Sequence, residues 1–150
     1  MDQISPTWPA TPLRVALFED NRDFADALAA LLQRAGLCVI IIEPSPAMLE
    51  QYADQEFDLV ITDVIMPKMD GLEVIREILQ YWPRVPIIAI SGGSSKLPSN
   101  LALKLSESFG ADKILYKPFM AVELFAAIAE LIPSFSAPPG RLADCLLAGG

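Results

Sequence analysis

The stretch FDLVITDVIMPKMDG, residues 57–71, joins a short apolar run to a polar loop. Residues 57–62 have the character of a strand that is covered on both faces of a parallel sheet. A charge inside such a strand would be costly, but Asp63 comes where the strand gives way to the loop. The carboxyl ends of strands are where α/β proteins keep their chemistry. We therefore expect Asp63 to be a functional carboxylate.

The same change from an apolar run to helical spacing occurs five times along the chain. Apolar runs predict strands at residues 13–18, 37–42, 57–62, 86–90 and 113–116. Helical spacing or helix-start signals predict helices at residues 24–32, 47–53, 72–79, 101–109 and 120–132. Ser45 and Pro46 have the residue types of an N-cap and a first helical position.

Five alternating strand and helix pairs predict an α/β fold with a doubly wound, five-stranded parallel sheet flanked by five helices. We assign this domain to residues 13–132, with an N-terminal tail over 1–12 and a C-terminal tail over 133–150. The second tail is expected to pack locally through three leucines, Leu142, Leu146 and Leu147.

The composition favours one soluble domain in a reducing compartment. With 150 residues and 53% hydrophobic content, the chain can build a full core. Cys38 and Cys145 form neither a disulfide framework nor a metal-binding spacing. No secretory signal is evident, and residues 120–132 fall short of the roughly 20 that span a bilayer. We expect a cytoplasmic protein without membrane association.

The charge excludes several classes of function. A formal net charge of −8 opposes nonspecific binding to nucleic acid, and the absence of histidine excludes histidine bases, histidine metal ligands and histidine-dependent triads. Residues 133–150 are too short and too poor in charge for a DNA-binding module. We expect no direct contact with nucleic acid.

Polar residues follow four of the five predicted strands, at what should be one edge of the sheet. They are Glu19 and Asp20 after the first strand, Asp63 after the third, Ser91 after the fourth and Lys117 after the fifth. Three carboxylates would repel one another, and one ammonium group offsets only one unit of charge. A divalent hard cation would relieve this repulsion, and an all-oxygen set favours Mg²⁺ over zinc.

These residues form an ordered constellation that resembles the response regulator receiver domain of two-component signalling, over about residues 13–132. The constellation comprises Glu19-Asp20, Asp63 with Met66-Pro67 and Asp70-Gly71, Ser91, and Lys117-Pro118-Phe119. Each element alone has an ordinary structural explanation, such as a turn at Asp70-Gly71 or a helix-dipole charge at Glu19-Asp20. Their shared order makes coincidence improbable. Single-domain, chemotaxis-regulator-like receivers have the same flavodoxin-like fold.

The resemblance implies that Asp63 accepts a phosphoryl group from a sensor histidine kinase or a phosphotransfer protein. It implies that Asp20 and Asp63 bind Mg²⁺ directly, that Glu19 helps through water, and that Ile65 contributes its backbone carbonyl. Lys117 and Ser91 would each take one phosphoryl oxygen. The domain would catalyse only its own phosphorylation and autodephosphorylation, so it would not be an enzyme with a separate substrate.

The chain departs from the family pattern at three places. Ile114 stands where an aromatic switch residue is usual, so an aromatic flip is impossible there. Residues 92–100 form a longer, glycine-containing connection that we expect phosphorylation to reorganise. Met120 stands where a polar N-cap would be expected, so the fifth helix should begin less firmly.

Three other functions share this fold or chemistry. A receiver that docks without phosphorylation keeps the fold, although the intact acidic cluster argues against it. An aspartate-nucleophile phosphohydrolase of the haloacid dehalogenase type requires a second aspartate at the position of Ile65. A flavin-binding domain requires a phosphate cradle, which residues 19–22 lack. With no effector domain after Ile132, we expect the output to be contact with a downstream protein partner.

Overall fold

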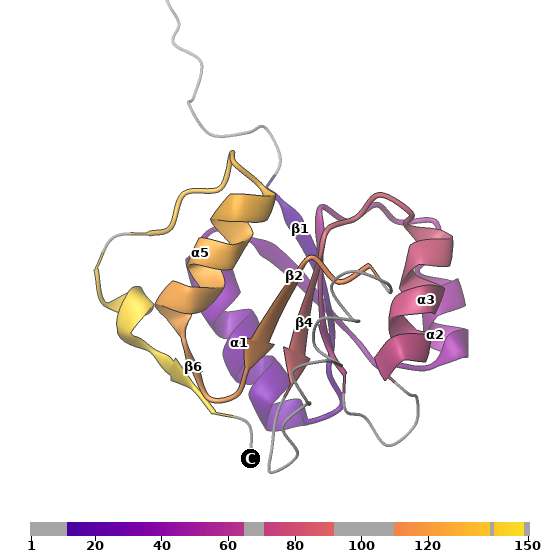
Figure 1. Cartoon of the computed structure of the whole chain (residues 1–150), viewed down its shortest axis with the longest axis horizontal. Helices are drawn as coiled ribbons and strands as arrows, with labels where there is room; N and C mark the ends of the chain where they lie inside the picture. Colours follow the sequence, from indigo (N-terminus) through magenta and orange to yellow (C-terminus); the bar gives the residue numbers. More distant parts are fainter. Residues whose placement is uncertain (1–11, 65–70, 92–109, 139, 149–150) are drawn as a thin grey trace, which may run out of the picture.

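A five-stranded parallel sheet forms the centre of the structure, a computed structural model that describes residues 12–64, 71–91, 110–138 and 140–148. Its strands are β1 (Arg14–Phe18), β2 (Cys38–Ile42), β3 (Leu59–Asp63), β4 (Ile87–Ser91) and β5 (Lys113–Tyr116). They lie side by side in the order β2-β1-β3-β4-β5, and every neighbouring pair is parallel. Figure 1 shows the sheet with helices on either side of it. The predicted sheet is confirmed, and each strand begins within two residues of its predicted start.

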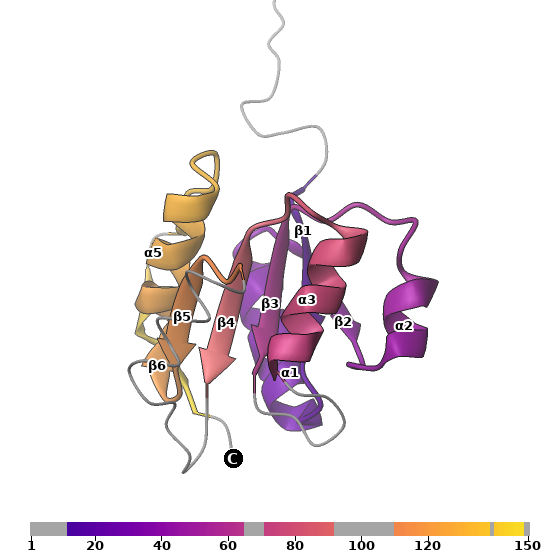
Figure 2. The same ribbon diagram turned by 45° about the vertical axis from the view of Figure 1, so that its right-hand side comes forward.

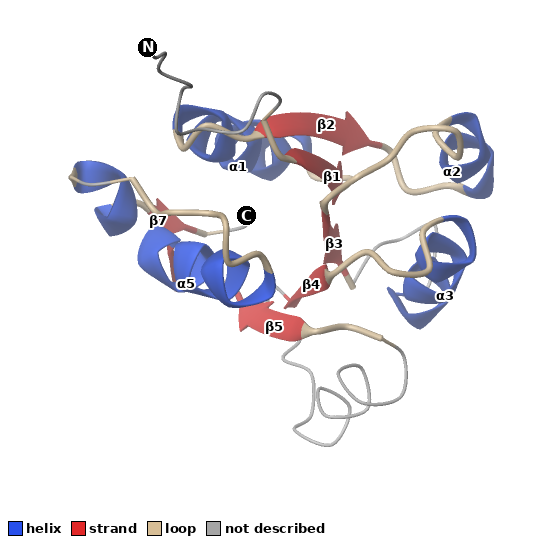
Figure 3. Cartoon of the chain, turned by 90° about the horizontal axis from the view of Figure 1, so that it is seen from above, coloured by secondary structure: helices blue, strands red, loops and turns tan. Residues whose placement is uncertain are grey.

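Helices cover both faces of this sheet. The described helices are α1 (Arg22–Arg34), α2 (Pro46–Gln51), α3 (Gly71–Tyr81) and α5 (Ala121–Leu131). Figure 3 shows α1 and α5 on one face and α2 and α3 on the other, which is the arrangement of a doubly wound domain. The helix predicted over residues 101–109 lies outside the described residues. None of the helices in the described ranges has the length and apolar character needed to cross a membrane.

Two hydrophobic cores result, one on each face of the sheet. Successive residues of a strand point to opposite faces, so Leu17 packs in the α1/α5 core and Phe18 in the α2/α3 core. In β3, Ile61 likewise packs in the α1/α5 core and Val60 in the α2/α3 core. All five residues of β3 are buried, which explains why its sequence is nearly continuous in apolar residues up to Asp63.

The helix starts follow local capping chemistry. The Ser45 hydroxyl accepts a hydrogen bond from the Met48 N–H at 3.3 Å, and Pro46 is the first residue of α2, as predicted. Asn21 caps α1, because its side-chain oxygen accepts from the Phe24 N–H at 3.0 Å. This cap places the first turn of α1 directly after the carboxyl end of β1.

The segment after α5 folds back onto the domain. It forms a short 3₁₀ helix, η1 (Arg141–Asp144), and a strand, β7 (Leu146–Leu147), which pairs antiparallel with β6 (Phe119–Met120). The expected packing is confirmed for Leu142 and Leu147. It was wrong for Leu146, which is 61% exposed, because neighbouring residues of a strand face opposite ways. Figure 2 shows β6 beyond the end of β5, beside α5.

The start of α5 is held without a polar N-cap. Glu123 accepts a hydrogen bond from the Met120 N–H at 2.8 Å, and the Cys145 carbonyl accepts from the Ala121 N–H at 2.7 Å. The first N–H groups of a helix have no acceptor within the helix, so these contacts replace the missing cap. The expectation of a weaker start at Met120 therefore needs revision, because the C-terminal segment supplies one of the acceptors.

The packing of α5 predicts that substitutions at two nearby positions have very different effects on the free energy of unfolding. Leu124 is fully buried and Val122 is 51% exposed. We expect Leu124→Ala to lower the free energy of unfolding by about 2–5 kcal/mol, and Val122→Ala to change it by less than about 0.5 kcal/mol. Urea unfolding followed by circular dichroism measures both. Equal losses in the two variants would contradict the placement of α5.

Candidate functional site

The carboxyl ends of four strands bring together residues from distant parts of the chain. Glu19 follows β1, Asp63 and Ser91 end β3 and β4, and Lys117 follows β5. The chain runs from β1 outward to β2 and then returns to β3 on the other side of β1, so the strand order reverses between β1 and β3. Ligands of open α/β sheets bind at such a reversal. Glu19 and Asp63 lie on its two sides.

One ammonium group joins the two carboxylates at this point. Lys117 Nζ lies 3.1 Å from Asp63 Oδ2 and 3.2 Å from Glu19 Oε1. The side chains are almost enclosed, with 7% of Lys117, 6% of Asp63 and 2% of Glu19 exposed. The Lys117 N–H also donates to the Ser91 carbonyl at 2.8 Å, which fixes the backbone after β5 to the end of β4. The structure thus unites three of the predicted site residues around Lys117.

The charges of Glu19 and Asp63 are only partly compensated by the Lys117 ammonium group. The pKa of Glu19 is raised from its ordinary value of 4.5 to about 7, chiefly by burial and in smaller part by the charge of Asp63 and a hydrogen bond with its carboxyl group. The Asn21 N–H, which donates to Glu19 Oε2 at 3.0 Å, and the Lys117 ammonium group act in the opposite direction. At neutral pH the site therefore holds Glu19 near the midpoint of its titration, and an added cation would favour the ionised form.

Ser91 presents a buried hydroxyl beside this cluster. The residue is 2% exposed, and its Oγ has no hydrogen-bond partner within the described ranges. A buried hydroxyl without a partner costs free energy, so such a group is typical of a site that awaits a ligand. The predicted place of Ser91 at the end of the fourth strand is observed, since it is the last residue of β4.

The residues predicted to hold Mg²⁺ are only partly assembled. Glu19 and Asp63 are buried together, whereas Asp20 is exposed, and Ile65 lies outside the described residues. Within residues 12–64, 71–91, 110–138 and 140–148, no three acidic or cysteine side chains lie close enough to hold a metal ion. The residues still fit a hard cation. Two carboxylates share one ammonium group, and the side-chain atoms available as metal ligands are oxygens.

The structure adds an aromatic residue that the sequence did not reveal as part of the site. Lys117 Nζ lies 3.9 Å from the centre of the Phe24 ring, in the geometry of a cation–π contact. Helical spacing indicated Phe24 only as a core residue of the first helix. Its position in the first turn after Glu19-Asp20 was the available signal, because that turn must border the same edge of the sheet.

Ile114 occupies the second position of β5 and is partly buried against the α2/α3 core. An aliphatic side chain in this place packs but has no polar group to exchange between two environments. The glycine-containing connection at residues 92–100, from which we expected a response, lies outside the described residues, as do Met66, Pro67 and Asp70.

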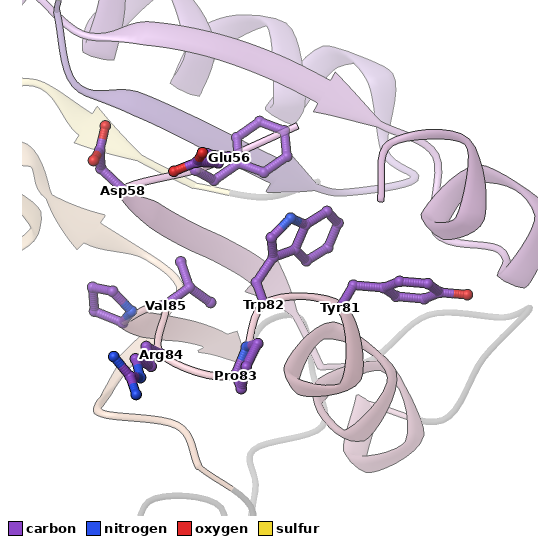
Figure 4. A pocket seen from close by; sticks show the side chains of 9 residues that line it. Glu56, Asp58, Tyr81, Trp82, Pro83, Arg84 and Val85 are labelled. Atoms are coloured by element: carbon purple, nitrogen blue, oxygen red, sulfur yellow. The ribbon is translucent and has the colours of Figure 1, made fainter. Parts of the chain in front are cut away.

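A separate hollow lies at the opposite edge of the sheet, before β3 and β4 (Figure 4). Its volume is about 440 Å³, and nine residues line it: Glu56, Phe57, Asp58, Tyr81, Trp82, Pro83, Arg84, Val85 and Pro86. The Trp82 indole N–H donates to the Gln55 carbonyl at 2.7 Å, which holds the ring in its wall. None of the predicted site residues contributes to this hollow.

Comparisons with known proteins agree with this geometry. A family model described as the response regulator receiver domain matches residues 15–129. The chain is similar to the sensory transduction protein RegX3 of Mycobacterium tuberculosis, with 29% identity over 91% of this chain and 58% of the relative. It is also similar to the transcriptional regulatory protein CreB of Escherichia coli, with 32% identity over 83% of this chain and 54% of the relative.

A solved structure shows the same arrangement of elements. The crystal structure of a response regulator receiver domain protein from Clostridium thermocellum matches with a TM-score of 0.70 and 28% identity. The match covers 81% of this chain and 94% of that protein. By contrast, the chain spans little more than half the length of the curated relatives it matches.

The raised pKa of Glu19 predicts an unusual dependence of stability on pH. Between pH 4.5 and about 7 the folded state binds more protons at Glu19 than the unfolded state does, so stability falls as the pH rises through this range. In metal-free protein we expect this residue to account for a loss on the order of 1–3 kcal/mol. Urea unfolding in EDTA at several pH values measures it.

Glu19→Gln is the matched variant, because its amide oxygen can still accept from the Asn21 N–H while the group no longer titrates. The decline of stability between pH 5 and pH 7.5 should be smaller in this variant. An identical pH profile in both proteins would show that Glu19 does not titrate in this range.

Proposed function

The chain belongs to the response regulator receiver domain family, and on this premise we propose that Asp63 is its phosphoacceptor. Receiver domains are signalling domains that sensor kinases phosphorylate. The observation that carries the assignment is the Asp63 carboxylate, buried at the end of the central strand with the Lys117 ammonium group 3.1 Å away. Asp63 also lies where the strand order reverses, which is the usual ligand-binding position of open α/β sheets, and this supports the assignment further.

The proposed reaction joins Asp63 to phosphorus. A carboxylate oxygen of Asp63 attacks the phosphorus atom of a phosphohistidine, a P–O bond forms, and the P–N bond breaks as the electron pair returns to the imidazole. Phosphoryl transfer requires in-line positioning and stabilisation of charge on the transferred oxygens. Lys117 would stabilise one oxygen by its charge. The Ser91 hydroxyl would donate a hydrogen bond to another, which gives this buried group the partner it lacks among the described residues.

We propose Mg²⁺ as the cofactor, bound by Asp20, Asp63 and the backbone carbonyl of Ile65, with Glu19 helping through water. When bound, the ion would supply positive charge to the phosphoryl oxygens. The support from this structure is the oxygen-only donor set and the raised pKa of Glu19, both of which indicate an acidic site that gains from a cation. Lys117 would then be free to interact with the phosphoryl group as well as with the carboxylates.

The proposed partners are a sensor histidine kinase or a phosphotransfer protein upstream and a protein surface downstream. CreB is named as a transcriptional regulator, and this chain matches only part of it. For this chain we keep the prediction of no direct nucleic-acid contact, on the basis of its net charge of −8. A separate enzymatic substrate is not proposed, because Ile65 stands where the haloacid dehalogenase chemistry requires a second aspartate.

The assignment of Asp63 predicts a covalent change that mass spectrometry can detect. On incubation with acetyl phosphate and Mg²⁺, the wild-type chain should gain one phosphoryl group, and Asp63→Asn should gain none. Omission of Mg²⁺ should slow the gain strongly. Asp26→Asn is a suitable control, because Asp26 is exposed on α1 and forms a surface ion pair with Arg22, away from the buried carboxylates.

A folded wild-type protein that gains no phosphoryl group would overturn this assignment and would favour the receiver that only docks. Phosphorylation of Asp63→Asn to the wild-type extent would place the acceptor elsewhere. Phosphorylation that proceeds equally well in EDTA would overturn the proposed role of Mg²⁺ and leave the acceptor in place.

Ser91→Ala should separate stability from activity. The substitution removes a buried hydroxyl without a partner in the described structure, so the free energy of unfolding should stay the same or rise by up to about 1 kcal/mol. Phosphorylation by acetyl phosphate should slow by at least about tenfold, because a donor to the transferred oxygens is lost. Ser91→Thr keeps a hydroxyl and should retain more of the rate. A rate in Ser91→Ala equal to that of wild type would exclude the role of Ser91.

A further inference from the structure

The C-terminal strand β7 reaches the candidate site through a chain of aromatic contacts, and we propose that Leu147 is a positioning residue for Lys117. Leu147 would act through Phe119 and Phe24, which lie between it and the ammonium group. The inference deepens the proposed function, because it concerns how the cation beside Asp63 is held in place.

The first contact in this chain is between Lys117 and Phe24. The Phe24 ring lies under the ammonium group at 3.9 Å, while the carboxylates of Glu19 and Asp63 lie within 3.2 Å of the same Nζ. The carboxylates and the ring together restrict the position of the ammonium group. A cation–π contact depends on the distance and the tilt of the ring, so a shift of Phe24 changes where Nζ is most stable.

The second contact fixes the Phe24 ring. Phe119 meets it edge to face, with 6.4 Å between the ring centres and an angle of 79° between the planes. Both residues are buried, at 4% and 2% exposure, and Phe119 lies two positions after Lys117 in sequence. Phe119 therefore restricts Lys117 in two ways: it fixes the backbone two residues away, and it holds the Phe24 ring that contacts the ammonium group.

The third contact brings in the C-terminal segment. Phe119 stands opposite Leu147 in the antiparallel pair of β6 and β7, and Leu147 is 5% exposed in the same core. Figure 3 shows β7 between α1 and α5. A hollow of about 200 Å³ remains between β7 and the start of α1, lined by Asn21, Asp23, Phe24, Ala27, Leu146, Leu147 and Ala148.

A two-residue strand has little stability of its own, so its buried side chain must hold it in place. Of the two side chains of β7, Leu147 is buried and Leu146 is 61% exposed. Loss of the Leu147 side chain would leave Phe119 and Phe24 without this wall next to the existing hollow. The rings would then gain freedom, and the Lys117 ammonium group would lose its fixed position.

Proton NMR of the lysine side chain tests this directly. The face of an aromatic ring shields nearby protons, so the ε-methylene protons of Lys117 should resonate upfield of those of the other lysines. Phe24→Leu should abolish this shift and thereby assign it. Leu147→Ala should reduce it by at least about half, Leu147→Met should retain most of it, and the matched control Leu146→Ala should leave it unchanged.

Circular dichroism and thermal unfolding establish that each variant is folded at the temperature of measurement. If Leu147→Ala does not fold, Leu147→Val, which removes less volume, takes its place in the same comparison. An unchanged Lys117 shift in a folded Leu147 variant overturns the proposal. An equal loss of the shift in Leu146→Ala also overturns it, because β7 would then act without regard to which side chain is buried.

Phosphorylation by acetyl phosphate supplies the second readout. Displacement of a positioned group can slow a reaction by roughly 10- to 100-fold, and we expect a loss in this range for Leu147→Ala and wild-type behaviour for Leu146→Ala. If the wild-type protein is not phosphorylated, the proposed function fails, and the NMR shift alone still decides whether Leu147 positions Lys117. If the shift falls and the rate does not, the positioning role in the reaction is overturned.

Discussion

The rest of the site depends on one ammonium group shared between two buried carboxylates. Taking these charges out of water costs free energy, and close approach with good geometry must offset that cost. Lys117 follows the edge strand β5, whereas Glu19 and Asp63 come from β1 and β3 in the middle of the sheet. The contact therefore exists only while the four neighbouring strands β1-β3-β4-β5 stay paired in this order. A slip of β3 by one residue would turn Asp63 to the opposite face and separate the charges.

The site also retains features that oppose stability. The Ser91 hydroxyl is buried without a partner in the described structure, and the raised pKa of Glu19 shows that its ionised form is disfavoured by its surroundings. A domain selected for stability alone would replace both with apolar groups. Such departures from good packing are expected where a protein must bind and stabilise a charged group.

The sequence predicted the parallel sheet, the edge at which the carboxyl ends of its strands meet, and the gathering of Glu19, Asp63 and Lys117 there. It could do so because buried parallel strands have a distinct apolar pattern and their carboxyl ends share one edge. It did not predict the contact between Lys117 and Phe24, since a helical period identifies a core residue without naming its neighbours. It missed β6 and β7, because two-residue strands leave no periodic pattern, and so it placed Leu146 inside. The positions of Asp20 and Ile65 around a cation stay predictions.

Trp82 lies at the end of the domain away from the candidate site and can serve as a fluorescent probe there. Its ring is 7% exposed, meets Phe57 edge to face with ring centres 5.3 Å apart, and lies at the amino-terminal edge of the sheet, away from Asp63. In a Trp8→Phe variant, in which Trp82 is the remaining tryptophan, its fluorescence should consequently respond to loss of the whole tertiary structure but be insensitive to events confined to the carboxyl edge. A change in Trp82 emission while the fold remains intact would therefore mean that a signal had crossed the full length of the strands.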